Sequence, residues 1–362
     1  MAQATRALTG RGDGTSPAGD RRAALVVAAE AALAHGDAVA AFEGFEQAGT
    51  MQHAADSEMG LVRAAMQLGH YRRALAFCAH VAGEHLDAPG AAVLYAWLLR
   101  VGGRRELADR ALREALARAP DDPVVIAAIA ALASPLPVAP LALLRPPNRV
   151  APFSSSVVGE QSPPPEARVL SSGVLLPGGR LALLSGRVRP SRLWVRNGLG
   201  ATREAVNDDD GDAEGDATRW RLTTPIDGSD DIDVGRPVPG TPAFGVEYAE
   251  TSTPIPAWPW MRAGFLGAAT ADGKTFRLGT DMAAAHAGGP VLDRAGGLVG
   301  MALRGADGRA TMRAVALRGT LADGEDLENG ARSRAKGPTI ELPFDQLYER
   351  ALRVAIQVIA VA

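Results

Sequence analysis

Three glycines recur at almost one period in the first third of the chain, and their spacing constrains the fold more than any other feature. Gly36, Gly69 and Gly103 are separated by 33 and 34 residues. The fifth, ninth and twelfth residues after each glycine are small or apolar: Ala41, Phe45 and Ala48, then Ala74, Cys78 and Val81, then Ala108, Leu112 and Ala115. A repeat of this length predicts stacked pairs of antiparallel helices.

The physical basis of this prediction is close helix packing. Two antiparallel helices approach closely where alanine faces alanine, and a larger apolar residue one turn further along fills the remaining space. Glycine supplies the tight turn between the helices. One pair cannot bury its apolar face alone, so neighbouring pairs stack. A further helix is expected in DDPVVIAAIAALAS, with Asp121 or Asp122 as N-cap and Pro123 in the first turn.

Over about residues 22–121 the pattern resembles the tetratricopeptide repeat, without the tryptophan usual in the first helix of each repeat. The resemblance implies a protein-binding or peptide-binding scaffold whose concave groove is lined by the first helix of each repeat. We predict that this groove takes an extended peptide with an apolar residue and a carboxylate. The predicted peptide-binding residues are Met59, Arg63, Met66, Trp97 and Arg100. Alternatively, Trp97 and the methionines belong to the core between repeats.

Charge and cysteine content exclude several classes of protein. A net charge of −3 over 362 residues gives no general attraction to nucleic acid or to an anionic membrane. The single cysteine, Cys78, cannot form an internal disulfide, and we expect it to be a buried, inert thiol. We find no export signal, and the apolar run ALRVAIQVIAVA is shorter than the ~20 residues that span a bilayer. The expected location is therefore the bacterial cytoplasm, without direct membrane insertion.

The second half has a different pattern. Proline is dense between Ser134 and Pro165, which predicts a semi-rigid linker. Short apolar runs separated by Gly, Asp and Pro follow, which predicts a β-barrel or sandwich. PVLDRAGGLVGMAL predicts a hairpin, and PFDQLYERALRVAIQVIAV predicts a closing helix. The expected segments are a disordered N-terminus (1–19), helical repeats (20–135), a linker (136–165) and a β domain (166–362).

Two acidic loops, Asn207–Asp216 and Asp227–Asp233, interrupt the β domain. A calcium loop counted from Asp208 needs glycine at its sixth position and glutamate at its twelfth, and those positions hold Ala213 and Arg219. We expect solvated loops, with a calcium site as the open alternative. We predict no cofactor and no metal ligands elsewhere.

The segment AGGPVLDRAGGLVGM resembles the end of the trypsin-like, Htr-type serine peptidases, where Gly-Asn-Ser-Gly-Gly-Pro precedes a hydrophobic hairpin. The resemblance covers roughly residues 165–350 and implies a double β-barrel. By resemblance, the nucleophile position is Ala287. The histidine position in SSGVLLPGGRLALLSGRV is Arg187, and the aspartate position in DATRWRL is Asp216.

These residues cannot form a catalytic triad. Ala287 has no hydroxyl to attack a carbonyl, and Arg187 cannot accept a proton at neutral pH. The only histidine of the β domain, His286, lies beside Ala287 and cannot also occupy the distant base position. In the oxyanion turn Ala285 replaces the usual glycine, so the turn formed by Ala285, His286 and Gly288 is degenerate.

The sequence therefore predicts a multidomain α plus all-β protein, with tetratricopeptide-like helices followed by a trypsin-like double β-barrel and a closing helix. We expect a non-catalytic adaptor or assembly factor that binds a protein or peptide through the helical groove, and no nucleic acid. Two alternatives stay open: a hydrolase that uses an unrecognised nucleophile, and a structural subunit of a secretion or envelope machine.

Overall fold

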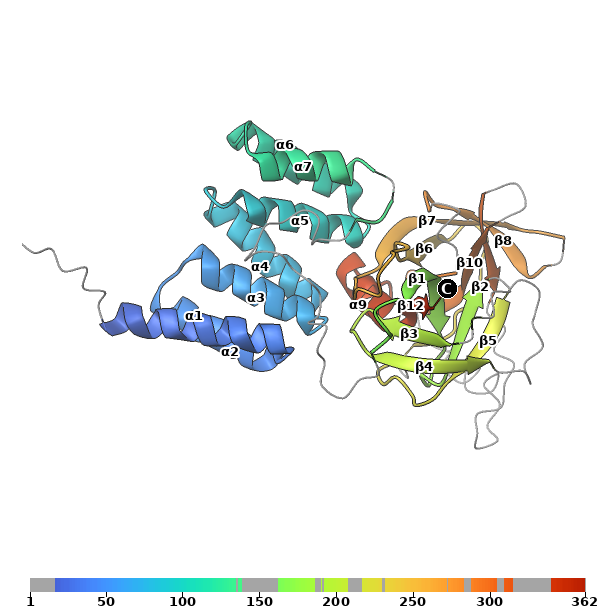
Figure 1. Ribbon diagram of the computed structural model, residues 1–362. Coiled ribbons are helices and arrows are strands. Elements are labelled where there is room, and N and C mark those ends of the chain that lie inside the picture. The colour runs from blue at the N-terminus through green and yellow to red at the C-terminus, as the bar shows by residue number, and fades with distance from the viewer. Residues whose placement is uncertain are drawn as a thin grey trace, which may run out of the picture.

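A computed structural model of the 362-residue chain shows a stack of helices beside a pair of β-barrels (Figure 1). It describes residues 17–134, 136–138, 162–185, 190, 192–207, 217–229, 232–271, 273–282, 288–304, 309–314 and 340–361. The fold class predicted from the sequence is confirmed: helical repeats precede two closed six-stranded antiparallel barrels.

The helical half consists of three antiparallel pairs and one further helix. They are α1 (Pro17–His35), α2 (Ala38–Met51), α3 (Ala55–Gln67), α4 (Tyr71–Glu84), α5 (Pro89–Val101), α6 (Arg105–Arg118) and α7 (Pro123–Leu132). The three repeating glycines form the turn inside each pair, with φ angles of 85°, 71° and 81° at Gly36, Gly69 and Gly103. Only glycine adopts such angles without strain, so the predicted role of the glycine period is confirmed.

The nine small and apolar positions that follow the glycines form the packed side of α2, α4 and α6. None of the nine exposes more than 3% of its surface. Asp122 caps α7, since its Oδ1 accepts hydrogen bonds from the backbone N–H groups of Val124 and Val125 at 2.9 and 3.0 Å. The turns inside the pairs and the start of α7 are thus set by glycines and a cap that are visible in the sequence.

The first barrel closes through the C-terminal strand. Its order is β1-β12-β3-β4-β5-β2. The strands are β1 (Arg168–Leu175), β2 (Leu181–Ser185), β3 (Leu193–Asn197), β4 (Thr202–Asn207), β5 (Ala217–Leu222) and β12 (Ala355–Ala360).

The second barrel has the order β10-β11-β8-β7-β6-β9. Its strands are β6 (Pro242–Glu247), β7 (Trp260–Ala269), β8 (Thr275–Gly279), β9 (Pro290–Leu292), β10 (Leu298–Arg304) and β11 (Ala310–Ala314). The predicted hairpin is β9–β10. Asp293 fixes its turn, because Oδ1 accepts from the N–H groups of Ala295 and Gly297 at 2.9 and 2.8 Å.

The predicted closing helix is wrong in its second half. Helix α9 covers Phe344–Val354, and the chain then becomes strand β12, Ala355–Ala360. Every residue of β12 is buried, and the strand pairs with β1 on one side and β3 on the other. A strand buried on both faces shows a continuous apolar run rather than alternation, so periodicity alone does not distinguish it from a buried helix.

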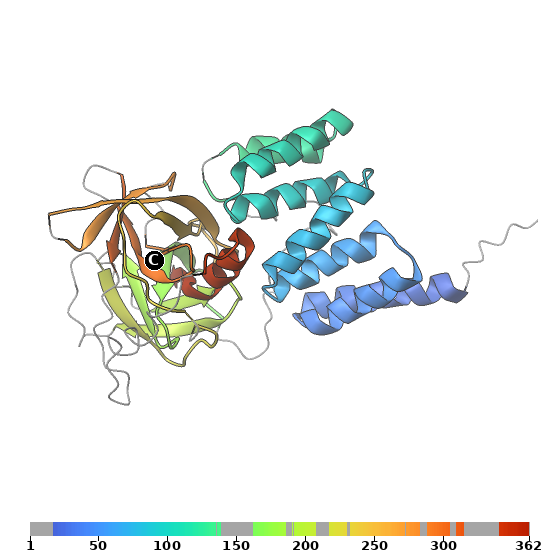
Figure 2. The ribbon, with the colours of Figure 1, turned by 180° about the vertical axis from the view of Figure 1, so that it is seen from behind.

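The helical and barrel halves share one hydrophobic core. Figures 1 and 2 both show α9 between the repeats and the barrels, and α9 contacts α4. Tyr71 packs against Tyr348 with ring centroids 4.4 Å apart. The hydroxyl of Tyr348 donates to the Pro259 carbonyl at 2.6 Å, and that of Tyr71 donates to the Leu98 carbonyl at 2.7 Å. These buried aromatic contacts join the two halves into one packed unit.

Within the described part of the chain, no helix combines the length and apolarity needed to cross a bilayer.

Candidate functional site

The five predicted peptide-binding residues lie inside the structure. Their exposed fractions are 2% for Met59, 5% for Arg63, 0% for Met66, 1% for Trp97 and 3% for Arg100. The two methionines and Trp97 belong to the hydrophobic core that extends from the repeats into the barrels, as the alternative interpretation of the sequence required. A peptide can therefore reach these residues only after part of the chain moves.

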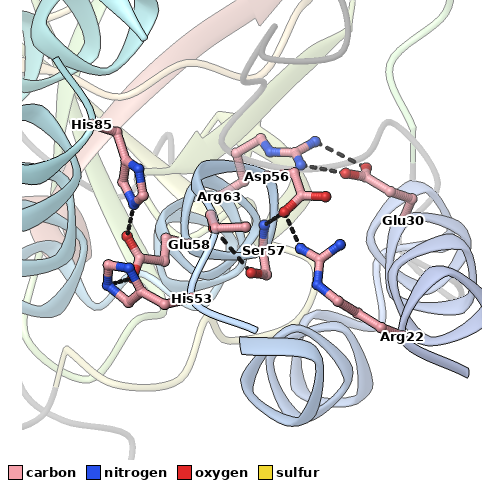
Figure 3. A network of polar contacts seen from close by, with 9 residues as sticks. Arg22, Glu30, His53, Asp56, Ser57, Glu58, Arg63 and His85 are labelled. Atoms are coloured by element: carbon pink, nitrogen blue, oxygen red, sulfur yellow. Dashed lines mark hydrogen bonds and ion pairs between the residues drawn. The ribbon is translucent and has the colours of Figure 1, made fainter. Parts of the chain in front are cut away.

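Arg63 on α3 is held by α1. Its two terminal nitrogens bind the two carboxylate oxygens of Glu30, with Nη1 donating to Oε2 at 2.9 Å (Figure 3). Its Nε donates to the Met59 carbonyl at 3.3 Å. This bidentate pair matches the fork geometry that arginine prefers. An incoming carboxylate would have to replace Glu30.

Arg100, in the last turn of α5, is less completely bonded. Nη2 lies 3.5 Å from the Ser134 carbonyl, and the guanidinium carbon lies 5.7 Å from the centre of the Trp260 ring. Nε and Nη1 are buried and have no hydrogen-bond partner among the described residues. Burial lowers the pKa of Arg100, and the neighbouring Arg105 and Arg262 lower it further. Nε and Nη1 of Arg100 are thus two donors available to a carboxylate, whereas Arg105 and Arg262 already contact Asp109, Asp281 and Glu247.

The start of the linker covers this site. The Trp97 indole Nε1 donates to the Val138 carbonyl at 2.8 Å. Together with the contact between Ser134 and Arg100, this bond lays residues 134 and 136–138 over the end of α5. In the described structure, two hydrogen bonds from α5 side chains thus hold residues 134 and 136–138 in this position.

The turn that contains Gly288 and Gly289 lies between the barrels. Gly288 has φ 115°, and its N–H donates to the Ala302 carbonyl at 2.7 Å. A Cβ on Gly288 would lie 2.3 Å from the Ser172 carbonyl oxygen of β1, and one on Gly289 would lie 1.7 Å from the Val246 carbonyl oxygen of β6. Both glycines are therefore required sterically.

The remaining residues of the predicted triad and oxyanion turn lie outside the described residues. They are Arg187, Asp216, Ala285, His286 and Ala287.

The structure also brings together residues that the sequence analysis did not combine. His53 from the α2–α3 loop, Glu58 from the first turn of α3, and His80 and His85 from the end of α4 meet at one end of the helical hairpin. The sequence contains a signal for this cluster. In an antiparallel helix pair the start of the first helix lies beside the end of the second, so residues 53 and 58 are expected near residues 80 and 85. The spacing of these residues along the chain does not match a known metal-binding motif, so the helix pairing is needed to bring them together.

A separate ion pair anchors the same helix to α1. Arg22 donates to Asp56, which also accepts from the Ser57 N–H at 2.7 Å (Figure 3). Burial acts to raise the pKa of Asp56, but the hydrogen bonds from Arg22 and Ser57 and the charge of Arg22 outweigh it, so the pKa lies below its usual value. These contacts fix α3 in place.

No protein-family model matches this sequence, and the search of curated proteins found no match. Among solved structures, a mutant of the O-GlcNAc transferase from Thermobaculum terrenum aligns over 35% of this chain with 17% identity and a TM-score of 0.29. This chain spans 24% of that protein's length. Similarity at this level carries no argument about function.

Proposed function

We propose that the protein is a non-catalytic adaptor or assembly factor, in which tetratricopeptide-like repeats bind a carboxylate-bearing peptide segment and a trypsin-like pseudoprotease domain supports them. The observation that carries the proposal is Arg100, a buried arginine whose Nε and Nη1 have no partner in the described structure. A buried charged donor without a partner costs free energy, which a bound carboxylate recovers.

The surroundings of Arg100 suit such a ligand. Trp260 provides aromatic surface beside the guanidinium, and Trp97, on the same helix as Arg100, stacks on Trp258. Arginine and aromatic residues in desolvated pockets dominate the binding energy of many interfaces. Residues 134 and 136–138 would leave when the peptide binds, so we expect slow association followed by a stable complex.

The barrel domain supports the non-catalytic part of the proposal, because it has the glycines of the turn but lacks two side chains that a catalytic triad requires. The turn keeps Gly288 and Gly289, at which any side chain would clash with backbone oxygens. The sequence places alanine at the nucleophile position 287 and arginine at the base position 187. A protein that retains the architecture without these groups has no route to acyl transfer through a triad. Because the chain has a single cysteine and so needs no oxidising compartment for an internal disulfide, we propose that the protein functions in the bacterial cytoplasm.

Peptide binding by the full chain tests the proposal. A library of peptides with free C-terminal carboxylates is screened, and affinities of selected peptides are compared with those of their amidated forms. Arg100→Met keeps the side-chain volume and removes the donors, so we expect at least a 10-fold loss of affinity with equal or higher stability. Arg113→Ala, on the exposed face of α6, is the control and should bind normally. Undiminished binding by Arg100→Met, or equal binding of amidated peptides, would overturn the proposal.

Inactivity is tested separately with casein, peptide substrates and a fluorophosphonate probe. We expect no labelling and no turnover. Turnover that disappears when one serine of the barrel domain is changed would establish the hydrolase alternative.

A further inference from the structure

We propose that His53, Glu58 and His85, with His80 as a fourth ligand, form a binding site for a divalent transition metal, for which we take zinc. The cluster lies at one end of the α3–α4 hairpin, away from Arg100 and the barrels. The inference is therefore independent of the proposed adaptor function.

The donor atoms already converge. His53 Nε2 lies 2.7 Å from Glu58 Oε1, and His85 Nε2 lies 3.1 Å from Glu58 Oε2. His80 Nε2 lies 3.2 Å from His53 Nε2 and 3.5 Å from Glu58 Oε1. In a tetrahedral zinc site with metal–ligand bonds of about 2.0–2.1 Å, neighbouring ligand atoms are about 3.3 Å apart. The four separations, from 2.7 to 3.5 Å, span this value.

Figure 3 shows His85 and His53 on opposite sides of the Glu58 carboxylate, with ring nitrogens directed at it. The potential ligand atoms of these three residues lie within 4.8 Å of one another. They come from three segments: a loop, the first turn of α3, and the C-cap of α4. Convergence from separate segments makes this a built arrangement rather than a run of surface histidines.

His53 and His80 approach the same oxygen of the carboxylate, Glu58 Oε1. A neutral imidazole has one donor and one acceptor nitrogen. With His53 Nε2 donating to Glu58, the adjacent His80 Nε2 has to share the same proton or turn its own toward the carboxylate at 3.5 Å. A divalent cation removes this competition, because all three nitrogens then present lone pairs and the carboxylate supplies the compensating charge.

The donor set selects the class of metal. Imidazole nitrogen with one carboxylate suits zinc and its neighbours in the first transition series, rather than calcium or magnesium, which prefer oxygen ligands. Glu58 is 12% exposed, whereas His53 and His80 are 59% and 50% exposed, so the ion can enter from solvent.

Binding would fasten the loop before α3 to the end of α4. Helix α3 is also joined to α1 by the ion pairs Arg22–Asp56 and Arg63–Glu30. The metal would therefore add a link from α4 to a helix that is already tied to the preceding repeat. We therefore expect zinc to raise the melting temperature.

The test uses the full chain, purified without a histidine tag and stripped with EDTA. Zinc titration followed by calorimetry and native mass spectrometry should give one ion per chain with a Kd below about 1 µM. His85→Ala and Glu58→Gln should each weaken binding by about 100-fold or more, since changing even a residue that only hydrogen-bonds to a metal ligand costs about 10–100-fold. The control is the double variant His35→Ala, His70→Ala, which removes two exposed histidines outside the cluster and should bind normally.

His53→Ala guards against a folding artefact, because His53 is exposed in a loop and its removal leaves the helices intact. It should abolish the zinc-dependent rise in melting temperature. Stoichiometric binding that survives His53→Ala and His85→Ala, equal loss in the control, or no one-to-one binding by the wild type would each overturn the proposal.

Discussion

The indole rings of Trp97 in the repeats and Trp258 in the barrel domain stack with centroids 6.2 Å apart and an interplanar angle of 23°. Trp258 also contacts Tyr71 and Tyr348, and it exposes only 2% of its surface. The ring therefore sits where the two halves of the molecule meet. Separating the halves would expose large aromatic surfaces on both.

Removing the Trp258 ring should destabilise the whole molecule. Trp258→Ala leaves a cavity among three aromatic rings, and we expect the free energy of unfolding to fall by about 3–5 kcal/mol. Chemical denaturation followed by circular dichroism measures this loss. Phe265→Ala is the matched control: this ring is 57% exposed, and its removal should cost less than about 1 kcal/mol. Equal losses would show that the halves do not depend on Trp258.

The turn between the barrels should tolerate no side chain. Gly289→Ala drives a Cβ into the Val246 carbonyl oxygen, and we expect a loss of about 3 kcal/mol or more, or failure to fold. The control is Gly83→Ala in α4, where a Cβ meets nothing within 4 Å. Alanine is the better helix former by about 0.5–1 kcal/mol, so this variant should be slightly more stable. Thermal melts of both variants check the prediction.

Restoring the missing groups should restore little chemistry. The double change Ala287→Ser, Arg187→His supplies a hydroxyl and an imidazole, but Ala285 still stands where the oxyanion turn normally has glycine. A side chain there disfavours the backbone orientation that presents the N–H, and an ineffective oxyanion donor costs about 10²–10³ in turnover. We expect at most weak hydrolysis of an activated ester. Activity equal to that of ordinary peptidases would refute this explanation of the turn.

Stability should fall at alkaline pH. Burial raises the pKa values of Tyr71, Tyr248 and Tyr348, and it also raises the pKa of the Cys78 thiol. The unfolded chain ionises these groups near about pH 8.5 for cysteine and about pH 10 for tyrosine, whereas the folded chain keeps them neutral. Their stabilising contribution is therefore complete below those values and is lost as the pH rises above them.

Urea midpoints measured between pH 8 and pH 11 test whether the stability falls as the pH rises. A constant midpoint across the range would contradict it. In the same samples Cys78 should react with a thiol reagent only after unfolding.

The repeat half was predictable in detail because the residues that determine each turn and each packed face lie close together in the sequence. A glycine fixes each turn, and the residues five, nine and twelve positions later fix the packed face, so one register determined all nine buried positions. Turn spacing predicted a β-barrel or sandwich, and the choice of a double barrel came from the resemblance of the segment around Asp293 to trypsin-like peptidases.

What the sequence did not show depends on contacts between distant segments. Strand β12 looks helical until it is known to lie between β1 and β3. Trp97 and Arg100 were assigned to an open groove because nothing local indicates that Val138 and Trp260 cover them. The histidine cluster required the pairing of α3 with α4 before His53 and His85 could be placed on one carboxylate.

The placement of β12 has a consequence for the order of folding. All six strands of the second barrel lie in the chain between β5 and β12, so the first barrel encloses the second in sequence. During synthesis β1 to β5 emerge early, yet their sheet keeps two unpaired edges until β12 arrives to join β1 and β3. Unpaired edges are sites of intermolecular pairing. The second barrel can complete itself first, and the interval before β12 emerges is when the nascent chain is most exposed to aggregation and to chaperones.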